Sequence, residues 1–300
     1  MVMAPLADTA TEPATGGVVT PPTSRTAGRG VTRLREYAPL IPFAIVLLLA
    51  LFGPMLAPQS ATMVVGTPST APSAEHWFGT DSNGFDVLSR TLTAFRLDVL
   101  IAVGVTALAT GVGIAIGTLA GMYGSRGGVL GVLAATLGRT IDLVQAMPVM
   151  IGGLVIVSFF GRNSVVIALA LALVMMPFQG RLMRSEVLRT RSDGFVTAAR
   201  MSGESESRIL VRHVIPNACA PVLENASAIF GMAIIFCAGL GFLGVGIPVP
   251  AAEWGNMLAD GAADAAVGRW WPALFPVLAL AFSVWAAAKV TSFVSRRRRT

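Results

Sequence analysis

Six apolar runs alternate with polar segments along the chain and indicate membrane-spanning helices. A helix needs about 20 mainly apolar residues to cross the hydrocarbon core of a bilayer. The fourth run is shorter than the others and must borrow residues at one of its ends to reach that length. Together the runs predict an all-α membrane protein with about six transmembrane helices. They cover residues 39–56, 97–120, 141–160, 165–178, 219–243 and 271–294.

The polar segments divide the remainder of the chain. Residues 1–35 are rich in Thr, Pro, Ala and Gly and lack an apolar run, which predicts a disordered tail. Residues 36–300 form the predicted membrane domain. Long connecting segments lie within it at residues 57–96, 179–217 and 244–270, and a basic tail ends it at residues 294–300.

The first connecting segment ends in an apolar helical stripe. Phe85, Leu88, Leu92 and Phe95 recur at spacings of three and four residues, which places them on one face of a helix. Such a helix either lies in the membrane interface or packs on the helix bundle. The spacing alone does not distinguish the two.

The composition supports the membrane interpretation and argues against nucleic acid as a partner. Hydrophobic residues make up 54% of the chain and charged residues 13%, whereas soluble domains carry about 25% charged residues. A soluble fold of this length would need a more charged surface. The net charge of +6 comes from arginines spread over the connecting segments, which is the pattern of membrane orientation.

The arginines predict how the chain is oriented. If the N-terminus is inside, seventeen arginines fall in inner segments and only four fall in outer segments. Inner segments of membrane proteins carry the excess of positive charge. We therefore expect an inner-membrane protein with both termini in the cytoplasm.

The sequence lacks the residue patterns of common catalytic and metal sites. His76 and His213 are the only histidines and are predicted on opposite sides of the membrane, and neither HExxH nor CxxC occurs. The only lysine, Lys289, is not part of a Walker A motif. Cys219 and Cys237 are interpreted as small apolar packing residues. We expect no catalytic residue, metal or cofactor in this chain.

Ionisable residues within the runs bear on how transport could be energised. Asp98, Asp142 and Lys289 lie near the ends of their runs, whereas Glu224 enters the fifth run. A proton relay at Glu224 would fit an ion-coupled carrier or channel that acts alone. The alternative is an interfacial carboxylate paired with an arginine, in a chain that needs an outside source of energy. A membrane scaffold without transport is a third possibility.

The inner segment 179–217 carries a recognisable motif. Residues 195–203 read FVTAARMSG and residues 208–217 read RILVRHVIPN. This resembles the EAA loop of ABC importer permeases, in the branch that imports dipeptides, oligopeptides and nickel. Thr197 stands where the name-giving glutamate often stands. The apolar residues in so basic a segment also indicate a helix that docks onto a partner.

Three other stretches are similar to segments of the same family, and they follow one another in the same order as in that family. Residues 78–90 read FGTDSNGFDVLSR, with Phe85 in place of the family's arginine, and residues 240–258 read LGFLGVGIPVPAAEWGNML. Arg139, Asp142 and Pro148 match the start of the family's third span, although the connector before them looks longer. The four stretches cover roughly residues 74–293, which is why the resemblance is specific.

The resemblance implies the type I ABC importer permease fold and a set of partners. These are a homologous second permease, two ATPase subunits that bind ATP and Mg²⁺, an extracytoplasmic substrate-binding protein and membrane lipid. The EAA loop would form the coupling helix, and the outer segment 244–270 would contribute to a gate. Di- or oligopeptides are the leading solutes, with nickel, metallophores and glutathione-like compounds open.

The resemblance also implies two groups of site residues. Arginines of the first group either pair with carboxylates of the ATPase or reflect membrane orientation alone. The coupling residues are Ala198, Ala199, Arg200, Gly203, Arg208, Arg212, His213 and Pro216. The gate residues are Gly241, Phe242, Leu243, Gly244, Glu253 and Trp254.

Overall fold

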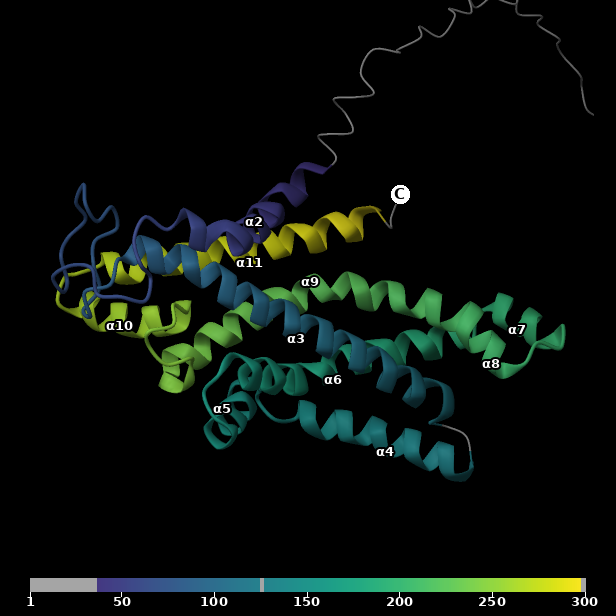
Figure 1. The fold of residues 1–300 in the computed structure, drawn as a ribbon. Helices are drawn as coiled ribbons and strands as arrows, with labels where there is room; N and C mark the ends of the chain where they lie inside the picture. The colour runs from purple at the N-terminus through teal and green to yellow at the C-terminus, as the bar shows by residue number, and fades with distance from the viewer. Residues whose placement is uncertain (1–36, 125–126, 298–300) are drawn as a thin grey trace, which may run out of the picture. The chain divides into compact units, whose positions relative to one another are not determined.

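The computed structural model describes residues 37–124 and 127–297, and within them the chain is almost entirely helical (Figure 1). The tail predicted at residues 1–35 lies outside the described residues. Apart from an isolated bridge between Thr80 and Asp86, the described residues contain no β structure. The helices are η1 Ala38–Leu40, α2 Ile41–Leu56, α3 Val87–Tyr123, α4 Gly128–Gln145, α5 Val149–Phe160, α6 Ser164–Arg191, α7 Gly194–Met201, α8 Glu206–Ile209, the π-helical turn η2 Leu210–Val214, α9 Ile215–Leu240, the π-helical turn η3 Gly241–Val245, α10 Trp254–Ala266 and α11 Trp271–Arg297.

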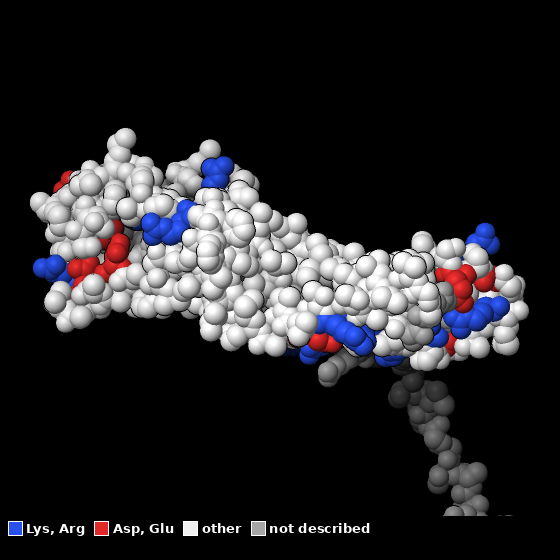
Figure 2. Space-filling model, turned by 90° about the horizontal axis from the view of Figure 1, so that it is seen from below, with Lys and Arg blue, Asp and Glu red and all other residues white. Residues whose placement is uncertain are grey.

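The expectation of a multi-pass membrane protein is confirmed. Large apolar side chains such as Leu51, Val129 and Phe159 are exposed on the helix surfaces, where lipid or another membrane protein would cover them. On the face in Figure 2 the charged side chains gather toward the two ends, and an uncharged stretch separates them. Six described helical segments are long and apolar enough to cross a membrane: Ala38–Leu56, Val87–Tyr123, Gly128–Gln145, Ser164–Arg191, Glu206–Val245 and Trp271–Arg296.

The third and fourth runs differ from their predicted form. The run at 141–160 is not one helix, because the chain breaks between Gln145 and Val149 into α4 and the short apolar helix α5. Pro148 has no N–H to continue the helical ladder and restricts the residue before it. The fourth run is not short, because α6 continues through the arginine-rich stretch as far as Arg191. Its Leu, Met, Glu and Arg residues favour helix.

The connecting segments contain more helix than expected. Helix α3 starts at Val87, capped by Asp86, so the apolar stripe predicted at the end of segment 57–96 forms the first turns of a membrane-crossing helix. It packs on the bundle instead of lying in the interface, with Phe95 buried. Segment 244–270 contains α10, which the sequence analysis missed. A bend at Gly203 separates α7 from α8.

Helices α3, α6 and α9 form the centre of the bundle, with α2 and α11 on one side and α4 and α5 on the other (Figure 1). The α3–α6 contact is the most extensive, and Gly113, Gly117 and Gly121 lie along it. A Cβ atom at Gly117 would collide with the carbonyl oxygen of Gly180, and one at Gly121 would lie 2.7 Å from a Val187 methyl group. Small residues four apart allow membrane helices to approach this closely.

A buried polar group joins the three central helices. Gln179 of α6 is fully buried, and its Nε2 atom donates to Thr110 Oγ1 on α3 at 2.9 Å and to the Val222 carbonyl on α9 at 3.2 Å. Asn225 Nδ2 of α9 donates to its Oε1 atom at 2.8 Å. The donors and acceptor of the amide are thereby satisfied, which an apolar interior requires.

A second apolar core lies where α7, α8 and η2 meet the ends of α3 and α6. Val196, Ile209 and Val214 are fully buried there against Met122 and Met183. Arg191 closes the same junction, since its guanidinium donates to the carbonyl oxygens of Gly121 and Met122 at the end of α3. The segment that carries the EAA-like motif is therefore packed onto the bundle, in agreement with its apolar residues.

The glycine contact predicts a position-dependent effect of one methyl group. Gly117→Ala should destabilise the protein by about 1–3 kcal/mol, because the methyl group overpacks the α3–α6 crossing. Gly111→Ala on the same helix is the matched control, since nothing lies within 4 Å of its added Cβ and alanine favours helix. Thermal unfolding in detergent measures both, and equal melting temperatures for the two variants would contradict the role of Gly117.

The second core predicts how firmly α7 and α8 are held. Ile209→Ala removes a fully buried side chain and should cost about 2–5 kcal/mol of local stability. Hydrogen exchange should then accelerate across residues 194–209 while the centre of the bundle stays protected. Val211→Ala serves as the control, because Val211 is 66% exposed and its truncation should change stability by less than about 0.5 kcal/mol.

Candidate functional site

A tight turn at Gly203 shapes the first group of site residues. Gly203 has φ +80°, a left-handed conformation that costs little only for glycine. Its N–H donates to the Arg200 carbonyl at 3.1 Å, and the Glu204 N–H donates to the Ala199 carbonyl at 3.2 Å. This pair of hydrogen bonds is the Schellman motif that ends a helix. It ends α7 and returns the chain toward α8.

The predicted coupling residues lie together on α7, α8, η2 and the first turn of α9. Ala198, Arg200, Gly203, Arg208, Arg212 and Pro216 are exposed, and Ala199 and His213 are half-buried. Two side-chain contacts brace the turn: Arg200 Nε pairs with Glu206 Oε1 at 2.7 Å, and His213 Nε2 is hydrogen-bonded to Glu204 Oε2 at 3.1 Å. The hydrogen bond from Arg200 to Glu206 raises the pKa of Arg200 above its ordinary value, so this arginine stays charged.

The surface that results is both basic and apolar. Arg208 and Arg212 form no ion pair with the described residues. Phe195, Met201 and Val211 are 46%, 80% and 66% exposed, although the sequence analysis did not include them among the site residues. Their apolar character within an arginine-rich segment was the available signal. We call this surface, formed by residues 194–216, the coupling surface.

The second group of site residues lies at the opposite end of the bundle, next to α10 (Figure 1). Gly241 is buried, whereas Phe242 and Leu243 are 51% and 53% exposed. Gly244 turns the chain with φ +80°, and its carbonyl oxygen accepts a hydrogen bond from Arg162 Nη1 at 2.9 Å. Residues 246–253, here called the strap, then lead to α10.

The strap is fastened to α3. Arg90 Nη2 donates to the Ala251 carbonyl at 3.3 Å, and the Trp254 N–H donates to Asp98 Oδ2 at 3.0 Å. Trp254 is fully buried, its Nε1 donates to the Thr91 carbonyl at 3.3 Å, and its ring packs edge-to-face on Phe95 at 4.7 Å. Four residues of α3 thus hold the strap and the start of α10 in place.

Arg90 is itself held from several sides. Its guanidinium lies 4.4 Å from the centre of the Phe85 ring, and its Nε atom lies 3.8 Å from Asp81 Oδ2. Burial raises the pKa of Asp81, while the hydrogen bond from the Phe85 N–H and the positive charge of Arg90 oppose that rise. Burial raises the pKa of Asp260 on α10 in the same way, and Arg90 again opposes it.

Glu253 caps α10 in a space that glycines leave open. Its Oε1 accepts the Gly255 N–H at 2.9 Å, and its Oε2 accepts the Asn256 N–H at 3.2 Å. A Cβ atom on Gly241 or Gly246 would collide with this carboxyl group. Burial raises the pKa of Glu253 to about 7, against the lowering effect of the two N–H donors.

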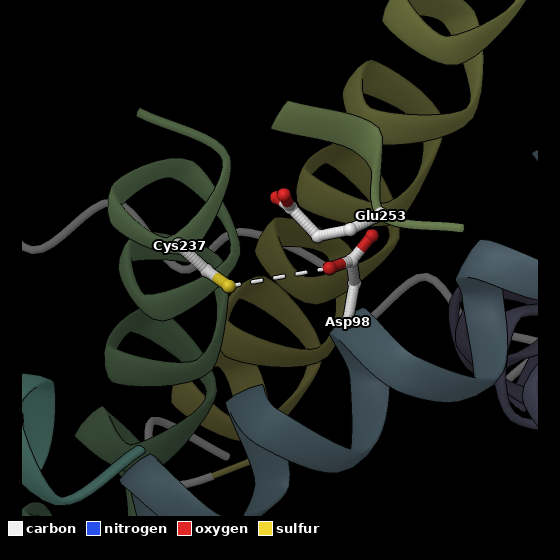
Figure 3. A group of neighbouring side chains, drawn as sticks. All are labelled: Asp98, Cys237 and Glu253. Carbon is white, nitrogen blue, oxygen red and sulfur yellow. Dashed lines mark hydrogen bonds between the residues drawn. The ribbon is translucent and has the colours of Figure 1, made fainter. Parts of the chain in front are cut away.

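Figure 3 shows Glu253 beside Asp98 of α3 and Cys237 of α9. Each of the three offers an oxygen or sulfur atom that lies within 4.8 Å of the other two, and all three side chains are buried. The thiol donates toward Asp98 Oδ1 at 4.0 Å. Among the described residues this is the one group of three such side chains so close together. The sequence analysis had treated Cys237 as packing and Asp98 as the end of a run.

Comparison with known proteins identifies the family. The model of the family described as "Binding-protein-dependent transport system inner membrane component" matches residues 113–298. The dipeptide transport system permease protein DppC of Alkalihalophilus pseudofirmus is 36% identical over 224 residues, which cover 74% of this chain and 71% of the relative. The di/tripeptide transport system permease protein DppC of Pseudomonas aeruginosa is 34% identical over 247 residues, with 80% and 79% covered.

Two further matches indicate the same kind of protein. The probable D,D-dipeptide transport system permease protein DdpC of Escherichia coli is 33% identical over 237 residues, covering 79% of this chain and 77% of the relative. A solved amino acid ABC transporter shares the fold at a TM-score of 0.54 and 14% identity, over 70% of this chain and 93% of the other. The chain has the ABC importer permease fold and belongs to the family of binding-protein-dependent transport system inner membrane components.

Proposed function

We propose that this permease forms half of the translocation pathway of an ABC importer for di- or oligopeptides. The observation that carries the proposal is that relatives more than 30% identical over about three quarters of the chain are named as peptide permeases. Nothing comparable supports nickel, metallophores or glutathione-like solutes. A homologous second permease would form the other half of the pathway.

The coupling surface is proposed to dock into the ATPase subunits, which bind ATP and Mg²⁺. Its exposed apolar residues, Phe195 and Met201, suit a partner cleft with apolar groups. Arg208 and Arg212, which form no ion pair within the described part of the chain, suit acidic groups in the same cleft. The second core supports this role, because buried Val196 and Ile209 would pass a displacement of α7 and α8 to α3 and α6. This chain would carry no bond-breaking chemistry itself.

The opposite end is proposed to face the extracytoplasmic binding protein and to form part of a gate. Exposed Phe242 and Leu243 precede the strap, and Arg162 holds the turn at Gly244. With the coupling surface in the cytoplasm, both termini would also be cytoplasmic, as the arginine distribution indicates. ATP binding would turn the bundle outward, and solute released by the binding protein would enter between the two permeases.

Affinity purification in mild detergent tests the assembly. A second permease, ATPase subunits and a binding protein should accompany this chain, and their identities can be read by mass spectrometry. The binding protein can then be screened with peptides of defined length. Recovery of this chain alone, active in liposomes without ATP, would contradict the proposal and favour a carrier.

The turn at Gly203 predicts a loss of coupling. Gly203→Asp should abolish ATP-dependent peptide uptake, because it strains the turn at φ +80° and places a carboxylate in the docking surface. The helix bundle should stay folded, because the strain is local and nothing lies within 4 Å of the added Cβ. Gly268→Asp is the matched control, with φ +87° and equally open surroundings at the other end. Uptake of a labelled dipeptide by the assembled importer measures both. Full uptake by the Gly203 variant would overturn the assignment of the coupling surface.

A further inference from the structure

Two buried carboxyl groups lie side by side without a cation. Asp98 is 2% exposed and Glu253 is 1% exposed. Among the described residues no nitrogen of Lys, Arg or His lies within 4.0 Å of either group. Buried carboxylates need a compensating charge or a proton, because their desolvation in an apolar interior is expensive.

The surrounding elements do not supply that charge. On α3, Arg90 lies two turns before Asp98 and is directed to Asp81 and the Ala251 carbonyl. Arg96 of the same helix is exposed and forms no ion pair with either carboxyl group. The Arg162 guanidinium donates to the Gly244 carbonyl. The titratable groups of α10 are acids, Asp260 and Asp264, and α9 contributes the Cys237 thiol. Helices α2 and α5, the turn η3 and strap residues 246–252 contain no titratable side chain, and Lys289 of α11 lies against Trp285.

The hydrogen bonds around the two carboxyl groups are too few to stabilise both of them in the ionised form. Both Glu253 oxygens accept backbone N–H groups, and Asp98 Oδ2 accepts the N–H of Trp254. Asp98 Oδ1 has only the weak thiol donor at 4.0 Å. Two carboxyl groups that share one buried site do not both ionise readily, since one proton removes their repulsion.

We propose that Asp98 and Glu253 do not ionise together in this site, so that one of them keeps a proton, and that Asp98 is thereby a positioning residue for the strap and the start of α10. With the proton in place, α3 and the cap of α10 are held together through Asp98, Glu253 and the Trp254 N–H. With both groups ionised, their repulsion pushes the cap away from α3 and loosens the strap. Only the consequence for gating rests on the proposed function, because the proton and its effect on the strap do not require transport.

The pH dependence of stability follows from the direction in which the pKa of Glu253 is shifted. Because burial raises the pKa of Glu253 from 4.5 to about 7, the folded protein binds the proton more tightly than the unfolded chain. The contribution of Glu253 to stability is therefore fully present below about pH 4.5 and is lost as the pH rises through about 7. The strap should be tighter in acid than in mild alkali.

The test uses the assembled importer in lipid nanodiscs between pH 5.5 and 8.5. Hydrogen exchange at residues 254–256, corrected for the intrinsic effect of pH, should show protection that falls as the pH rises, together with a falling melting temperature. Glu253→Gln should abolish this pH dependence, because its amide has no proton to lose in this range. Asp98→Asn should lower the pH at which protection is lost, because it removes the neighbouring carboxyl group and keeps an acceptor for Trp254. Asp142→Asn, an exposed carboxyl group beside Arg181, should keep the wild-type profile.

Three results would overturn the proposal. The first is a wild-type protection profile without pH dependence, and the second is an Asp98→Asn profile with the same midpoint pH as the wild type. The third is stabilisation by Zn²⁺ or Cd²⁺ that EDTA reverses and Cys237→Ala abolishes, because that would assign the charge compensation to a metal. A Cys237→Ala variant that keeps the pH profile supports the carboxyl pair. Since protection and melting temperature do not depend on uptake, failure here is distinguishable from failure of the peptide-import proposal.

Discussion

Where α3 crosses α6, backbone meets backbone, because Gly113, Gly117 and Gly121 present no side chain to the neighbouring helix. In a membrane, lipid tails are as apolar as leucine, so helices associate chiefly through close packing and hydrogen bonds between them. The α3–α6 crossing supplies the packing and Gln179 supplies the hydrogen bonds. The positions of the other helices depend on this contact.

Both site regions are attached to the same long helix, α3. The start of α3 fastens the strap through Arg90, Thr91 and Asp98, while its end contributes Met122 to the core beneath the coupling surface. With 37 residues and about 1.5 Å per residue, α3 is roughly 55 Å long. A rigid helix of that length transmits a movement of one end to the other end, and no chain of intermediate side-chain movements is needed.

Much of this arrangement could be predicted from the sequence, because its signals are local. Apolar runs revealed five of the six spans, whereas the third span, Gly128–Gln145, overlaps its predicted run only at residues 141–145. Helix boundaries were less accessible, since α6 continues beyond its apolar run as far as Arg191 and Pro148 divides the third run. The group of Asp98, Cys237 and Glu253 could not be found in this way. Asp98 and Cys237 are 139 residues apart and meet only through tertiary packing.

The π-helical turn at Leu210–Val214 has a consequence for how this chain tolerates changes in length. A π-helical turn holds one residue more than an α-helical turn, and this one joins α8 to α9 without interrupting the helix. Deleting one residue within it can restore a regular α-helix and leave the buried faces on either side in register. The same deletion further along α9 would rotate all that follows by about 100°, turning Ile229, Ala233 and Cys237 out of the core.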